Sequence, residues 1–115
     1  MANPVVHFEI QSNDAEQLHR FYGDAFGWKV DANNPMNYGI VEAGQGGIAG
    51  GIAPSMGGEN LVTFYIQVDD VPASLDKIEK LGGKIVMPAM DVPDGPTIAL
   101  FADPKGNTIG LVKTV

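Results

Sequence analysis

Apolar and polar residues alternate along two segments of the chain, which is the pattern of a β-strand with two different faces. In the first segment, residues 5–11, one face holds Val6, Phe8 and Ile10, and the other holds Val5, His7 and Glu9. In the second segment, residues 61–68, one face holds Val62, Phe64, Ile66 and Val68, and the other holds Leu61, Thr63, Tyr65 and Gln67. The purely apolar faces are predicted to lie under helices, and the mixed faces to line a wetter space.

A helical periodicity follows each of these strands. The first helix is predicted to begin at Asn13, with Glu16 completing a capping box, and to end at Gly27. Its apolar stripe comprises Leu18, Phe21, Tyr22, Ala25 and Phe26. His19 lies beside this stripe and is predicted to be solvated. The second helix is predicted to begin at Asp69 or Asp70, with Pro72 in its first turn, and to run to Gly82.

Short apolar runs separated by glycine and proline follow each helix and predict strands. These runs are residues 28–30, 38–42 and 47–53, then 84–88, 97–101 and 108–112. Residues 102–107, between the last two runs, form a strong turn signal. The proline-rich segment from Met87 to Pro96 is predicted to form a lid. Each half of the chain therefore predicts the order βαβββ.

The two halves also resemble each other in sequence. When the chain is shifted against itself by 56 residues, four of the eight residues from His7 to Asp14 match those from Thr63 to Asp70. We therefore predict an α+β fold in a single domain, residues 1–115, with internal repeats of about 1–56 and 57–115. The curved mixed sheets of the two repeats are predicted to surround a cavity.

Composition excludes several classes of function. The chain has 115 residues and no cysteine, so a disulfide framework, a thiolate zinc site and a cysteine nucleophile are excluded. The net charge of −7 argues against a nucleic-acid partner and against an anionic membrane surface. The sequence begins without a secretory signal and has no apolar run suited to a membrane helix. We expect a cytoplasmic protein.

Four local motifs carry a resemblance to a known family. They are Phe21-Tyr22 before Phe26-Gly27-Trp28, Val68-Asp69-Asp70-Val71, Leu81-Gly82-Gly83, and Asp103-Pro104-Lys105-Gly106-Asn107. With the duplicated βαβββ order, the chain resembles the vicinal oxygen chelate superfamily. That superfamily includes glyoxalase I, extradiol dioxygenases, fosfomycin resistance enzymes and bleomycin resistance proteins. The resemblance implies its fold, but fold alone does not determine function.

The resemblance also implies four positions for metal ligands. They fall on His7, near Gly50 or Gly51, on Thr63 and on Gly110. A catalytic metal needs about three nitrogen or carboxylate donors, and of these positions only His7 provides one. We therefore expect no cofactor. The alternative is a divalent metal in a site rebuilt around His7 by Glu9 or Glu42. The glycines at the other positions are predicted to leave room in the cavity.

The sequence leaves more than one function open. The leading hypothesis is a metal-free homodimer that binds a small apolar or weakly cationic molecule. Its candidate ligand-binding residues are His7, Glu9, Tyr38, Glu42, Thr63 and Tyr65. Tyr38 and Tyr65 are interpreted first as core aromatic residues, with walls around a ligand as the alternative. The alternatives are a metal-dependent lyase or dioxygenase and a structural dimer without a ligand, so the sequence does not decide whether the chain is an enzyme.

Overall fold

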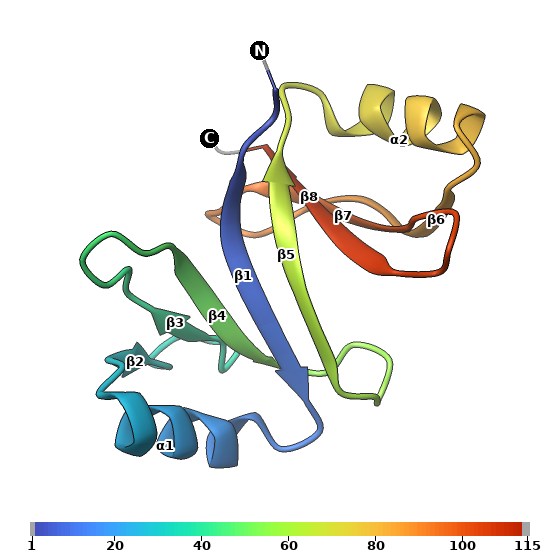
Figure 1. The fold of residues 1–115 in the computed structure, drawn as a ribbon. Coiled ribbons are helices and arrows are strands. Elements are labelled where there is room, and N and C mark those ends of the chain that lie inside the picture. Colours follow the sequence, from blue (N-terminus) through green and yellow to red (C-terminus); the bar gives the residue numbers. More distant parts are fainter. Residues whose placement is uncertain (1, 114–115) are drawn as a thin grey trace. The chain divides into compact units, whose positions relative to one another are not determined.

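A computed structural model describes residues 2–113. The chain folds into two compact units. The first unit is His7–Thr63, and the second combines the residues up to Val6 with those from Phe64 onward. Each unit contains one helix and a mixed sheet in the order βαβββ (Figure 1). The predicted α+β fold and its element order are therefore confirmed.

Five elements lie wholly or mostly in the first unit. They are β1 (Val5–Ser12), α1 (Ala15–Phe26), β2 (Val30–Asp31), β3 (Gly39–Val41) and β4 (Ala49–Pro54). The strands lie in the order β2-β3-β4-β1, with β4 parallel to β1 and antiparallel to β3. In this register Glu9 of β1 lies opposite Gly51 of β4. The predicted strand at 28–30 lies two residues too early, because the chain first passes Trp28 to complete the turn from the helix.

The second unit repeats this arrangement. The elements that lie wholly or mostly in it are β5 (Leu61–Gln67), α2 (Val71–Lys80), β6 (Lys84–Asp91), β7 (Thr97–Ala102) and β8 (Thr108–Lys113). The strands lie in the order β5-β8-β7-β6, and β8 is parallel to β5. Tyr65 lies opposite Gly110, the register position that Glu9 and Gly51 occupy in the first unit. The predicted lid is wrong, because β6 extends to Asp91 and only residues 92–96 form a turn.

Aspartates cap both helices. The Asp70 carboxylate accepts a hydrogen bond from the Ala73 amide at 3.0 Å, as the sequence predicted for α2. For α1 the predicted cap is wrong by one residue, since Asp14 and not Asn13 accepts from the Gln17 amide. Gly27 ends α1 with a φ of 70°, a left-handed conformation that glycine adopts without strain. Among residues 2–113 no helix has the length and apolar character needed to cross a membrane.

The two helices contribute unequally to their cores. From α2, Val71 and Leu75 are buried and pack with residues of the strands of the second unit. From α1 only Ala15 is buried, although the helix contacts β4 and its fully buried Ile52. Most of the aromatic side chains predicted for the α1 stripe are therefore not enclosed within the unit.

The burial of the two long strands agrees only in part with the prediction. As predicted for the apolar face of β5, Ile66 and Val68 pack with Val71 and Leu75 of α2. Glu9, Thr63 and Tyr65 on the mixed faces are only 5%, 5% and 3% exposed. Val62 and Phe64 on the apolar face of β5 are 76% and 38% exposed. The expectation that the mixed faces line a wetter space is wrong at these three buried residues, because Glu9 is hydrogen-bonded and Tyr65 packs within a core cluster.

Candidate functional site

Four polar side chains of the first unit form a connected hydrogen-bond network. His7 Nε2 lies 2.8 Å from the Tyr38 hydroxyl, which donates to Glu9 Oε1 at 3.1 Å. Gln11 Nε2 donates to Glu9 Oε2 at 2.7 Å. We call His7, Glu9, Gln11 and Tyr38 the His7 network. Because strand side chains two residues apart share a face, β1 supplies three of its members, and Tyr38 reaches them from the segment before β3.

The direction of these hydrogen bonds fixes the proton position on His7. The Tyr38 hydroxyl has one proton, and that proton is donated to Glu9. The hydroxyl oxygen must therefore accept from His7, so Nε2 carries the His7 proton. In the neutral ring, Nδ1 then carries the lone pair. The network thus runs in one direction, from the imidazole through the phenol to the carboxylate.

The Asn34 side chain holds the backbone of Tyr38 in place. The Asn34 side chain accepts from the Tyr38 amide at 2.9 Å and donates to the Tyr38 carbonyl at 2.7 Å. The intervening turn places Asn37 at a φ of 52°, a left-handed conformation that asparagine tolerates better than most residues. Two bonds from one amide therefore fix the direction in which the Tyr38 side chain leaves the main chain.

Glycines provide the space that the aromatic rings occupy. A Cβ atom added at Gly51 would overlap the Tyr38 phenol, and one added at Gly50 would overlap the Phe8 ring. In the second unit, a Cβ at Gly110 would overlap the Tyr65 ring. The prediction that these glycines leave a cavity open is wrong, because an aromatic ring of the same unit covers each of them.

Burial lowers the pKa of His7 below its ordinary value of 6.5, because the imidazolium loses hydration. The negative charge of Glu9 acts in the opposite direction and offsets part of this effect. Since the folded chain binds this proton less readily than the unfolded chain, the neutral ring is the form that the fold favours.

The lowered pKa predicts a pH-dependent stability. As the pH falls from about 6.5 toward the lower pKa of folded His7, the unfolded chain takes up more protons and the free energy of unfolding decreases. Above about pH 6.5 the His7 ring is neutral in both the folded and the unfolded chain, so this group no longer lowers the free energy of unfolding. Urea unfolding followed by the fluorescence of Trp28 measures it in the first unit. The dependence should be weaker in His7→Gln, and equal dependence in both proteins would show that His7 is not its source.

The other predicted site residues lie outside the His7 network. Glu42 is exposed just after β3, and Thr63 is buried in β5. Tyr65 belongs to the second unit, where it packs with Leu100 and Val112. A contact of any of these three with a ligand stays a prediction.

Sequence reasoning missed two residues that shape the site. Gln11 shares a strand face with His7 and Glu9, and the period of the strand could have identified it. Asn34 lies in an Asn-Asn-Pro turn signal, but nothing in the sequence tells which backbone groups it binds. His19, predicted to be solvated, is instead half-buried, and its Nε2 lies 2.9 Å from the Ile52 carbonyl oxygen.

The donor atoms do not fit a metal held at the positions that the family resemblance implies. In the first unit, both carboxylate oxygens of Glu9 already accept hydrogen bonds, and Gly51, opposite Glu9 in the register, has no side chain that could hold a metal. In the second unit, Gly110 likewise offers none. Among residues 2–113, no three side chains of histidine, cysteine, aspartate or glutamate gather as a metal site would require.

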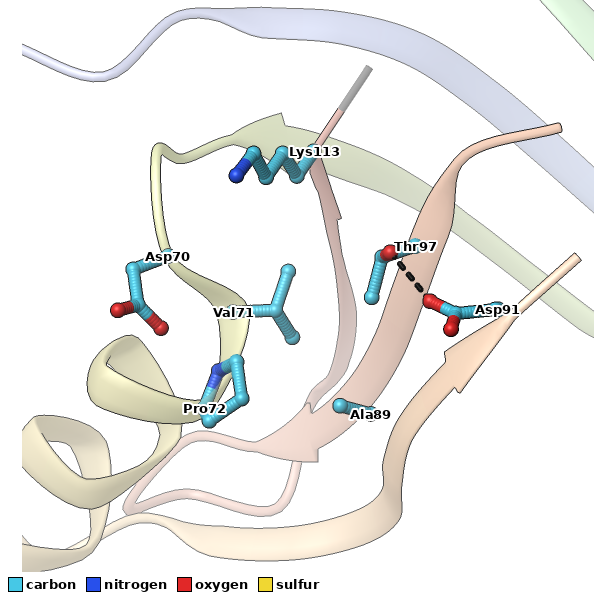
Figure 2. A pocket seen from close by; sticks show the side chains of 7 residues that line it. All are labelled: Asp70, Val71, Pro72, Ala89, Asp91, Thr97 and Lys113. Carbon is cyan, nitrogen blue, oxygen red and sulfur yellow. Dashed lines mark hydrogen bonds between the residues drawn. The ribbon is translucent and has the colours of Figure 1, made fainter. Parts of the chain in front are cut away.

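A separate pocket of about 430 Å³ lies in the second unit, between the start of α2 and the strands β6 and β7 (Figure 2). Its lining residues are Asp70, Val71, Pro72, Ala89, Asp91, Thr97 and Lys113. The carboxylate of Asp70 caps α2, and the Thr97 hydroxyl donates to Asp91 at 2.6 Å. The hydrogen bonds of these groups serve local structure, so the pocket provides no argument for a ligand.

Comparisons with known sequences place the chain in a family. Residues 5–111 match the model of the Glyoxalase/Bleomycin resistance protein/Dioxygenase superfamily. A Mycobacterium bovis protein named "Putative glyoxylase CFP32" is 33% identical over 111 residues, covering 90% of this chain and 42% of that protein. The chain thus spans less than half the length of this relative. A "Glyoxylase-like domain-containing protein" of Didymella fabae is 35% identical over 112 residues, covering 87% of this chain and 85% of that one.

Solved structures agree with this assignment at the level of the fold. Methylmalonyl-CoA epimerase from Mycobacterium tuberculosis is similar with a TM-score of 0.71 at 14% identity, covering 96% of this chain and 87% of that chain. A glyoxalase/bleomycin resistance protein/dioxygenase superfamily member from Vibrio splendidus has a TM-score of 0.65 at 14% identity, with 97% and 99% covered. The match over residues 5–111 shows that this chain belongs to the Glyoxalase/Bleomycin resistance protein/Dioxygenase superfamily.

Proposed function

We propose that this chain binds a small molecule without a resident metal, and that the His7 network supplies the polar contacts. The observation that carries the proposal is the burial of Glu9, which is 5% exposed and bonded to both Tyr38 and Gln11. Burying a carboxylate is costly, and apolar residues of similar volume often stabilise a fold equally well. A buried polar network of this kind is therefore better explained by recognition than by stability alone.

The charge of the chain supports a class of ligand. With a net charge of −7, the protein attracts cations and repels anions over long range. The neutral His7 ring favours a partner that brings a hydrogen-bond donor. A small apolar molecule with a hydroxyl, amide or weakly cationic amine group meets these requirements. We also propose that the chain acts as a homodimer in solution.

A metal-dependent lyase or dioxygenase is the alternative that the sequence left open. It requires about three protein donors around one ion. His7 and Glu9 supply two, but Glu9 is committed to Tyr38 and Gln11. The donor set therefore favours binding over metal-assisted chemistry.

Nuclear magnetic resonance with a library of neutral and weakly cationic fragments tests the proposal. We expect fragments to shift the amide signals of residues 7–11 and Tyr38 in the ¹⁵N-labelled protein. Tyr38→Phe keeps the ring but removes the hydroxyl, so fragment affinity should fall about tenfold, the loss of roughly one good hydrogen bond. Tyr22→Phe, a hydroxyl removal outside the network, is the matched control. Fragments that bind wild type and Tyr38→Phe equally, or shift only distant amides, would contradict the proposal.

A further inference from the structure

Asn34 binds Tyr38 through its side chain and closes the turn between them through its main chain. The Asn34 carbonyl accepts a hydrogen bond from the Asn37 amide at 3.1 Å, and Pro35 follows at a turn position where proline is favoured. The Asn34 side chain accepts from the Tyr38 amide at 2.9 Å and donates to the Tyr38 carbonyl at 2.7 Å. We call these three hydrogen bonds of one residue the Asn34 clamp.

A side-chain amide satisfies both main-chain groups of Tyr38. The Tyr38 amide needs an acceptor and its carbonyl needs a donor, and the Asn34 side chain presents one of each. An aspartate would present acceptors alone, and an alanine neither. A reversed Asn34 amide would set a donor against the Tyr38 N–H and an acceptor against its carbonyl, so the backbone also fixes the direction of the amide. The chemistry of residue 34, and not only its size, therefore determines how firmly Tyr38 is held.

The chain immediately after Tyr38 is held independently of the turn. Gly39 is buried and lies opposite Ile52 in the pairing of β3 with β4. A Cβ atom at Gly39 would overlap the His19 ring, whose Nε2 lies 2.9 Å from the Ile52 carbonyl oxygen. Because α1 and β4 already fix this side of Tyr38, the Asn34 clamp on the other side decides how Tyr38 itself is oriented.

The orientation of Tyr38 in turn sets the proton position on His7. The Tyr38 hydroxyl lies 2.8 Å from His7 Nε2 and 3.1 Å from Glu9 Oε1, and hydrogen bonds weaken steeply when their atoms move apart or out of line. A small rotation of the Tyr38 main chain displaces the hydroxyl most, because the hydroxyl is the far end of the side chain. Once it is displaced, the phenol no longer holds the His7 proton on Nε2, and the tautomer protonated at Nδ1 gains population.

The tautomer of His7 determines which kind of ligand group its ring recognises. With the proton on Nε2, Nδ1 acts as an acceptor, whereas in the other tautomer Nδ1 donates. We propose that Asn34 is a positioning residue: by holding Tyr38, it makes the His7 network select ligands that donate a hydrogen bond over ligands that only accept one. This inference rests on the proposed function, ligand binding by the His7 network, and it requires no contact between Asn34 and the ligand.

The ¹⁵N resonances of the His7 ring test the positioning step without a ligand. At about pH 8, above the ordinary histidine pKa of 6.5, the wild type should show two well-separated shifts, one for the protonated nitrogen and one for the lone-pair nitrogen. The His7 signals are those that disappear in His7→Gln. In Asn34→Ala the two shifts should approach each other, and Asn34→Asp, which keeps the bond to the Tyr38 amide, should lie between. Asn33→Ala changes the neighbouring exposed asparagine and should resemble the wild type.

Two probes that differ by one methyl group test the selectivity. Phenol donates a hydrogen bond, whereas anisole, its methyl ether, only accepts one. The wild type and Asn33→Ala should bind phenol about tenfold more tightly than anisole, as followed by the amide shifts of residues 7–11. In Asn34→Ala this preference should fall to about threefold or less, with Asn34→Asp between the two. Circular dichroism checks that each variant is folded, and Asn34→Asp carries the test if Asn34→Ala does not fold.

The outcomes separate this inference from the proposed function. A wild type that binds neither probe at residues 7–11 would contradict ligand binding by the His7 network, and the selectivity would fall with it. If the wild type prefers phenol but both Asn34 variants keep that preference and the wild-type ¹⁵N shifts of His7, only the role of Asn34 is overturned. Equal binding of phenol and anisole by the wild type would overturn the selectivity and leave binding in place.

Discussion

Replacing Gly51 by alanine is expected to destabilise the first unit by about 3 kcal/mol, far more than a glycine-to-alanine change in a strand would otherwise cost. The new Cβ would occupy space filled by the Tyr38 phenol, and Gly51 lies in the buried strand β4, which cannot move aside freely. Tyr38 must then leave His7 and Glu9, so steric strain and lost hydrogen bonds combine. Urea unfolding followed by Trp28 fluorescence measures the effect. Gly44→Ala is the control, since a Cβ there meets nothing within 4 Å.

A double-mutant cycle identifies the cause of this loss. In a Tyr38→Ala background the ring is gone, and Gly51→Ala should cost less than about 0.5 kcal/mol, because alanine is otherwise no worse than glycine in a strand. The coupling energy should therefore approach the whole effect of the single substitution. Additive effects would show that Gly51 is needed for a reason other than the position of Tyr38.

Glu9→Ala is expected to lower the free energy of unfolding by about 3 kcal/mol, which is the second large effect. The substitution leaves the Tyr38 hydroxyl and the Gln11 amide without their acceptor, and each unpaired buried donor costs about 1–3 kcal/mol. Glu9→Gln keeps one acceptor oxygen and should cost about half as much. The same unfolding experiment measures both variants.

Glu42→Ala is the matched control for Glu9, because it removes a carboxylate from an exposed position of the same unit. Glu42→Ala should change the free energy of unfolding by no more than about 0.5 kcal/mol. If Glu9→Ala proved as mild as Glu42→Ala, Glu9 would have to be a solvated carboxylate with replaceable partners, and the recognition role of the His7 network would lose its support.

Local sequence signals predicted the elements of the fold well. Period-two alternation located β1 and β5, and Asp70 with Pro72 marked the start of α2 because capping is a short-range interaction. The α1 cap was wrong by one residue, since Asn13 and Asp14 are both good caps and only the chain path decides between them. The extension of β6 through Pro88 to Asp91 depends on pairing with β7, which a proline-rich sequence does not reveal.

The site was harder to predict, because its geometry depends on contacts between distant residues. The alternation pattern correctly placed His7 and Glu9 on one face, but it assigned that face to a wet surrounding. Tyr38 lies 29 residues beyond Glu9, and only its turn and the space above Gly51 bring its hydroxyl to the carboxylate. A glycine in a strand signals close approach of another group, but it does not identify that group.

The most direct test of metal-free recognition is elemental analysis of the purified protein, followed by a thermal-unfolding titration with zinc, nickel, manganese and iron(II). A metal that binds only the folded state stabilises it by about 2.7 kcal/mol at a hundredfold excess over its dissociation constant. We expect far less than one metal per chain and no rise in Tm. A metal near one per chain, with a raised Tm that is lost in His7→Gln, would contradict metal-free recognition and establish a rebuilt metal site around His7.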